Sequence, residues 1–181
     1  ALFGVTFYQL FDFLGTLFEY WWPRRERYPR VKPFTSYVDN LIEGKGGHAA
    51  MPHLADDLIV VRAEIVSALQ TIVSRVLDPT QQAVVSVTEF LTDGTRNALP
   101  STVTLQGDTR AFLPAVQDRL EASMRRIVEG ICAAHGVRGR LDYSREFAAT
   151  INSEREAGAA ARAAGEVLGT GNVVADCLPI M

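Results

Sequence analysis

The chain has 181 residues, of which 48% are hydrophobic and 22% are charged, and this balance is typical of a globular protein with about one domain. The net charge of −3 provides no extended positive field, which argues against nucleic acid as a partner. Two cysteines, Cys132 and Cys177, lie far apart in the sequence and indicate neither a disulfide framework nor a zinc knuckle.

The first 22 residues are rich in aromatic side chains, but they fit neither a signal peptide nor a membrane span. They lack a basic start and a small-residue cleavage site, and Gln9, Asp12 and Glu19 would each be costly in hydrocarbon. Prolines and a basic cluster follow. We therefore treat residues 1–36 as a separate segment and expect a cytoplasmic protein without a membrane partner.

Hydrophobic periodicity organises the chain from residue 37 onward. The expected strands are 37–43, 84–90, 102–112 and 138–148, and the expected helices run from Asp56, as its cap, to about residue 78 and from Pro114 to Gly136. In the third strand, Val103, Leu105 and Thr109 share one face, whereas Arg110 belongs to the other.

The order β-α-β-β-α-β predicts an α+β fold, a ferredoxin-like sandwich over residues 37–150. Its four-stranded antiparallel sheet would carry both helices on one face. Ser153 and Glu156 form a capping-box pattern, which predicts a third helix to about Leu168. Residues 151–181 would begin a further segment.

Residues 44–53, GKGGHAAMPH, are the part of the sequence richest in candidate chemistry. Three glycines allow the backbone to approach another segment closely, with His48 and His53 beside it. The residues alone favour a glycine-rich turn with exposed histidines, because this spacing on a loop does not aim both rings at one metal. A phosphate loop is a poorer fit, since no GK[ST] follows.

Residues 44–57, GKGGHAAMPHLADD, combine with NALP at 97–100, TLQGDTRAF at 104–112 and MRRI at 124–127. Together these motifs resemble the satellite domain of the metallo-amidohydrolases of peptidase clan MH. The similarity covers about residues 40–181 and is strongest to the branch of hippurate hydrolases, N-acyl-amino-acid amidohydrolases and auxin-conjugate hydrolases. It implies the same ferredoxin-like lid, homodimerisation through that domain, and N-acyl amino acids as substrates.

The resemblance also implies roles for four residues. His48 matches the lid histidine that donates to the scissile carbonyl oxygen as negative charge develops there. Asn97 and Arg110 match positions that bind the carboxylate end or the amide of the substrate, partly across a dimer interface. His53 would orient His48 or cap the loop. A structural histidine and a solvated arginine are the respective alternatives for His48 and Arg110.

The metal site of the family does not match this sequence. Residues 1–5 resemble the segment before the satellite domain, but Thr6 stands where a metal-binding histidine normally follows. Divergence and an artefact both remain open there. The other ligands would precede residue 1 or follow residues 178–181. We therefore expect a fragment that is inactive alone and binds no metal, with zinc, manganese or cobalt in the intact enzyme. The alternative is a non-catalytic dimerisation or ligand-binding module.

Overall fold

The computed structural model describes residues 31–174 of the protein. Thr6 and residues 178–181, on which the expected remnants of a catalytic domain depend, lie outside the described residues. Among the helices of residues 31–174, none is long and apolar enough to span a membrane.

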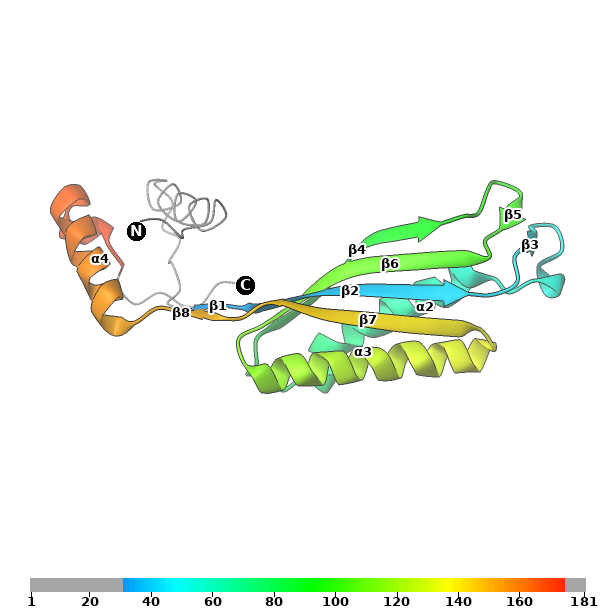
Figure 1. The fold of residues 1–181 in the computed structure, drawn as a ribbon, viewed down its shortest axis with the longest axis horizontal. Helices are drawn as coiled ribbons and strands as arrows, with labels where there is room; N and C mark the ends of the chain where they lie inside the picture. The colour runs from blue at the N-terminus through cyan, green and yellow to red at the C-terminus, as the bar shows by residue number, and fades with distance from the viewer. Residues whose placement is uncertain (1–30, 175–181) are drawn as a thin grey trace, which may run out of the picture.

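Four strands of ten residues form one antiparallel sheet, whose order is β4-β6-β2-β7 (Figure 1). The strands are β2 (Phe34–Glu43), β4 (Ala83–Thr92), β6 (Thr102–Ala111) and β7 (Arg138–Phe147). Strand β2 begins three residues before the start that periodicity predicts, because Phe34 still pairs with Ala111 of β6. Strands β4 and β7 are the two edges of the sheet.

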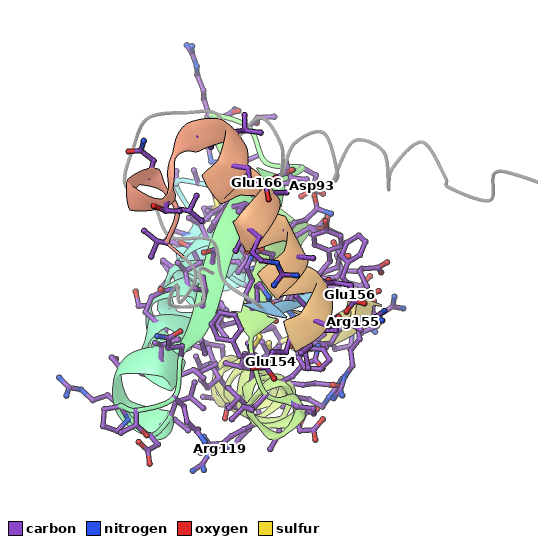
Figure 2. All side chains as sticks on the ribbon, turned by 90° about the vertical axis from the view of Figure 1, so that its left-hand side faces the viewer. Asp93, Arg119, Glu154, Arg155, Glu156 and Glu166 are labelled. Atoms are coloured by element: carbon purple, nitrogen blue, oxygen red, sulfur yellow. The ribbon has the colours of Figure 1, made fainter. Side chains whose placement is uncertain are left out.

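Two helices cover one face of this sheet. Helix α2 (Leu58–Thr71) continues as a π-helical turn, η2 (Ile72–Val76), and α3 (Pro114–His135) lies beside it (Figures 1 and 2). The core between the helices and the sheet includes Val38, Ile42, Leu58, Ile65, Leu69, Val103, Leu105, Leu120, Met124 and Val128. The predicted α+β architecture with a four-stranded antiparallel sheet is confirmed.

The helix ends show which local predictions were right. Gly136 closes α3 in the left-handed conformation with φ 69°, as predicted. The assignment of Asp56 as the cap of α2 was wrong. Asp57 is the N-cap, and its carboxylate accepts the backbone N–H groups of Ile59 and Val60 at 3.1 and 3.3 Å. The carboxylate of Asp56 instead accepts the N–H of Lys45 at 2.7 Å.

The capping-box prediction for α4 (Glu154–Leu168) was only partly right. Ser153 is the N-cap residue, but its side chain makes no capping hydrogen bond to the backbone. Its hydroxyl donates to the carboxylate of Glu156 instead. The helix still ends at the predicted Leu168, and the short turn η3 (Thr170–Asn172) follows.

Both ends of the sheet domain leave it at the same place. The short strand β1 (Val31–Lys32) pairs with β8 (Thr150–Ile151) in a two-stranded ribbon that leads toward α4. At the opposite end of the molecule lie β3 (Gly47–His48), β5 (Ala98–Leu99) and the 3-10 turn η1 (Pro52–Leu54) (Figure 1). The domain thus has a connected end and a free end, and the candidate histidines lie at the free end.

Candidate functional site

Two loops form the free end of the domain, which we call the tip: residues 44–57 and residues 93–101. They are joined by β3 and β5, in which Gly47 pairs with Leu99 and His48 with Ala98. The ladder continues with the N–H of Ala49, which donates to the carbonyl oxygen of Asn97 at 3.0 Å. The structure therefore brings His48 and Asn97 together from loops on different strands.

Close backbone approach explains the glycines of this loop. A Cβ atom on Gly46 would lie 2.9 Å from the carbonyl oxygen of Leu99, and one on Gly47 would lie 2.7 Å from the Cβ of Ala55. Larger residues would push the two loops apart or displace η1. The glycines serve the contact between the loops, which supports neither a phosphate loop nor an unconstrained turn.

His48 is an exposed residue whose ring is fixed on one side. The N–H of Ala50 donates to Nδ1 of His48 at 3.1 Å, so this nitrogen acts as the acceptor of the ring. The neutral imidazole therefore carries its proton on Nε2. Within residues 31–174, Nε2 makes no hydrogen bond, and its N–H is available as a donor to another molecule.

Asn97 occupies a tight turn and is oriented in the same manner. Thr95 and Ala98 exchange backbone hydrogen bonds at 3.1 and 3.2 Å, which leaves Arg96 and Asn97 as the two turn residues. The hydroxyl of Thr95 donates to Oδ1 of Asn97 at 3.2 Å. Both residues are exposed, and within residues 31–174 neither Nε2 of His48 nor Nδ2 of Asn97 donates a hydrogen bond, so the tip offers two side-chain N–H donors.

Two aspartates that sequence reasoning missed as site residues close the bases of these loops. Asp56 accepts the N–H of Lys45, and its own N–H donates back to the Lys45 carbonyl at 2.8 Å. Asp93 accepts the N–H groups of Ser101 and Thr102, both at 3.0 Å, and the Ser101 hydroxyl at 2.6 Å. The Asp93-Gly94 dipeptide was the available signal, but it indicated only a turn.

Arg110 lies at the other end of the sheet. It pairs with Thr35 and Val84 near the connected end, eight residues along β6 from Thr102 at the tip. At 3.3 Å per residue, this separation is about 26 Å. Its side chain is 43% exposed on the face opposite the core, as predicted, and its Nε donates to Asp108 at 2.9 Å. A single copy does not bring Arg110 to His48 and Asn97.

His53 lies in η1 and is exposed. It makes no hydrogen bond to His48, nor to any other residue that the structure describes. The expectation that His53 orients His48 thus has no contact to support it, since the group that fixes the His48 ring is the N–H of Ala50.

Comparison with known proteins gives relatives for this region, although no family model matches the chain. The N-acyl-L-amino acid amidohydrolase of Geobacillus stearothermophilus is 41% identical over 111 residues, which are 61% of this chain and 30% of that protein. The N-acetyldiaminopimelate deacetylase of Leuconostoc mesenteroides is 43% identical over 104 residues, which are 58% of this chain and 27% of that protein.

Comparison with solved structures finds the same kind of relatives as comparison of sequences. A structure assigned as an aminohydrolase from methicillin-resistant Staphylococcus aureus matches with a TM-score of 0.70 at 30% identity, covering 86% of this chain and 40% of that one. Over the matched region, the chain is similar to members of the metallo-amidohydrolase family. Aminopeptidase PepT from Bacillus cereus shares the fold with a TM-score of 0.65 at 17% identity, over 80% of this chain and 38% of that one.

The amidohydrolase relatives are much longer than this chain, which spans less than a third of the length of those curated relatives. The family implies a divalent metal. Within residues 31–174, however, no group of three or more His, Cys, Asp or Glu side chains could hold a metal ion. The described residues therefore do not fit a metal centre, and no reaction step through a metal can be assigned to them.

Proposed function

We propose that this chain forms the lid, or satellite, domain of an amidohydrolase that cleaves the amide bond of N-acyl amino acids. The lid would be the ferredoxin-like sandwich of residues 37–150, and residues 1–36 and 151–181 would belong to a catalytic domain. The joint exit of β1 and β8 supports this arrangement, because a domain inserted into another needs both connections at one end. Zinc, manganese or cobalt would be held outside residues 31–174.

The observation that carries the proposal is the donor pair at the tip. In amide hydrolysis, negative charge develops on the scissile carbonyl oxygen. N–H groups that are already oriented toward that oxygen lower the barrier, by roughly 2.7–4 kcal/mol for one donor in other enzymes. Nε2 of His48 and Nδ2 of Asn97 are our candidates for such donors, and the hydrogen bonds that Ala50 and Thr95 make to their acceptor atoms support this assignment.

Arg110 would bind the carboxylate of the substrate, because its planar guanidinium can form two hydrogen bonds with that group. The ion pair with Asp108 holds the guanidinium beside the open face of the sheet. Because Arg110 lies near one end of β6 and His48 lies in the tip beyond the other end, one site would need Arg110 from one copy and the tip from a second copy.

The surface around β4 is suited to such pairing. β4 is an edge strand, and edge strands can pair with another chain. The end of β4 nearest the tip exposes Phe90 and Leu91. Helix α2 packs against β4 and β6, and it exposes Ile59 and Val60. A symmetric contact across this edge would bury these apolar side chains, which supports a homodimer.

A hydrolysis assay tests this function directly. The full-length protein is expected to hydrolyse N-acetyl amino acids when zinc, manganese or cobalt is supplied, and the 181-residue chain alone is expected to show no turnover. Turnover by the isolated chain would contradict the proposal that this chain supplies only the lid. A full-length protein that binds these compounds but hydrolyses none of them would favour the non-catalytic module.

A further inference from the structure

The carboxylate of Asp93 joins the two ends of the 93–101 hairpin through hydrogen bonds. Asp93 stands at the end of the regular β4–β6 ladder and accepts three hydrogen bonds from Ser101 and Thr102 on the opposite strand. Between these two anchor points lies the whole hairpin, including the turn that carries Asn97. We propose that Asp93 is a positioning residue that holds the donors of Asn97 and His48 in one arrangement; this rests on the substrate-contacting role proposed above.

The carboxylate is connected to the His48 loop as well as to its own hairpin. Ser101, which donates twice to Asp93, accepts the N–H of Gly44 on its carbonyl oxygen at 3.1 Å. Gly44 opens the loop in which His48 follows. Three residues later, at Gly47, the chain enters β3, which pairs with β5 of the Asp93 hairpin. Asp93 thereby constrains both members of the donor pair through Ser101.

We call the Asp93 carboxylate and its hydrogen bonds to Ser101 and Thr102 the Asp93 clamp. In this clamp, hydrogen-bond donors surround a carboxylate anion. The hydroxyl and backbone N–H of Ser101 and the backbone N–H of Thr102 favour the ionised carboxylate and lower the pKa of Asp93 below its ordinary value of 3.8. Asp93 is exposed and lies outside the hydrophobic core. Replacing it should therefore loosen the tip without unfolding the sheet and helices.

Asp78 provides a matched control. It is also an exposed aspartate in a loop, and its carboxylate accepts the N–H of Thr80 at 2.8 Å and the Thr80 hydroxyl at 2.6 Å. The hydroxyl and N–H of Thr80 lower the pKa of Asp78, and the charge of Arg119 in α3 adds to this effect. Figure 2 shows Arg119 and Asp93 at opposite sides of the view. Asp78→Asn removes a similar anchor far from the tip.

Nuclear magnetic resonance on the 181-residue chain can measure how far the Asp93 clamp restricts the tip. In Asp93→Ala, amide hydrogen exchange at Ser101 and Thr102 is expected to rise about tenfold, since hydrogen bonds to a charged acceptor are among the stronger ones. Exchange should also rise at Ala49 and Ala50, and the ring nitrogens of His48 should leave the single Nε2–H tautomer. Asp93→Asn, which keeps one acceptor oxygen, should fall between Asp93→Ala and the wild type.

Kinetics of the full-length protein then separate this inference from the proposed function. Asp93→Ala should lower kcat about tenfold with little change in KM, less than deletion of a donor would cause, and Asp78→Asn should change neither. Unchanged exchange at Ala49 and an unchanged His48 tautomer in Asp93→Ala would overturn the assignment of Asp93. A wild-type protein that hydrolyses no N-acyl amino acid would instead contradict the function on which the assignment rests.

Discussion

Arg62 of α2 and Asn40 of β2 are bonded to each other in the interior of the domain. The guanidinium donates to the side-chain oxygen of Asn40 and to the carbonyl oxygens of Asn40 and Val103, and Arg62 is fully buried. The side-chain nitrogen of Asn40 donates onward to the carbonyl of Arg140 at 2.8 Å. Burial lowers the pKa of Arg62 to about 10. One side chain of α2 thus ties that helix to β2 and β6.

Removal of one partner from this pair should destabilise the fold strongly. Asn40→Ala removes the side-chain acceptor of Nη1 of the buried Arg62 and the side-chain donor to the carbonyl of Arg140, while the two backbone acceptors of Arg62 remain. We expect the free energy of unfolding to fall by about 3 kcal/mol. Urea denaturation measures this change. The double substitution Asn40→Ala and Arg62→Met should cost less than the sum of the single changes, because the pair is coupled. Simple additivity would contradict the coupling.

Gly107 and Gly130 give opposite predictions for the same substitution. A Cβ on Gly107 would lie 2.2 Å from the carbonyl oxygen of Ser86, beside the irregular register of β4 between Val87 and Glu89. Gly107→Ala should therefore destabilise the domain by about 1–3 kcal/mol. In α3, a Cβ on Gly130 would meet nothing within 4 Å, and Gly130→Ala should stabilise by about 0.5–1 kcal/mol. Thermal unfolding of both variants would show shifts of opposite sign.

The order of the tip should depend on pH only under acidic conditions. Because the pKa of Asp93 is lowered by its donors, the stabilisation that it provides is complete above the ordinary value of 3.8 and is lost as the pH falls through the lower value in the folded protein. Amide exchange at Ser101, corrected for its intrinsic pH dependence, should show this loss. Asp93→Asn should abolish the step, and a transition that persists in this variant would point to another group.

His48 and His53 should differ sharply in their effect on catalysis. In the full-length protein, His48→Ala should lower kcat by about 10²–10³-fold, the loss observed when an oxyanion donor is removed elsewhere. His53→Ala serves as the matched control, because His53 is exposed in η1 and makes no hydrogen bond to His48. Steady-state kinetics check both variants. Equal losses would show that the tip tolerates no substitution and would remove the specific role of His48.

The sequence was sufficient for β2, β6, α2 and α3 because each of these elements buries one repeating face. Val103, Leu105 and Thr109 alternate along β6 and are all buried, as predicted. In α3, periodicity predicts a buried stripe of Val116, Leu120, Met124, Ile127 and Ile131, and the first three are buried. In the C-terminal half of the helix the stripe is displaced by one residue, because Ile127 and Ile131 are only partly buried whereas Val128 and Cys132 face the core. Periodicity fixes the existence of a buried face more firmly than its centre.

The site was harder to predict because it depends on contacts between distant residues. β3 and β5 have two residues each, too few for a periodic pattern, so their pairing leaves no trace in the sequence. The motifs placed His48, Asn97 and Arg110 in one set without regard to strand direction, whereas β6 separates Arg110 from the tip. Likewise, polar residues such as Arg62 and Asn40 reveal their burial only once their partners are known.

In the homodimer that we propose, the tip of one copy completes the site that contains Arg110 of the other copy. Coexpression of full-length His48→Ala with full-length Arg110→Ala tests it, because a mixed dimer would contain one site with both residues intact. With random pairing, about a quarter of wild-type activity should return, although each variant alone is nearly inactive. His48→Ala with Asn97→Ala should not recover, since both changes lie in the tip. Activity no higher than that of the parent variants in the first mixture would contradict the claim.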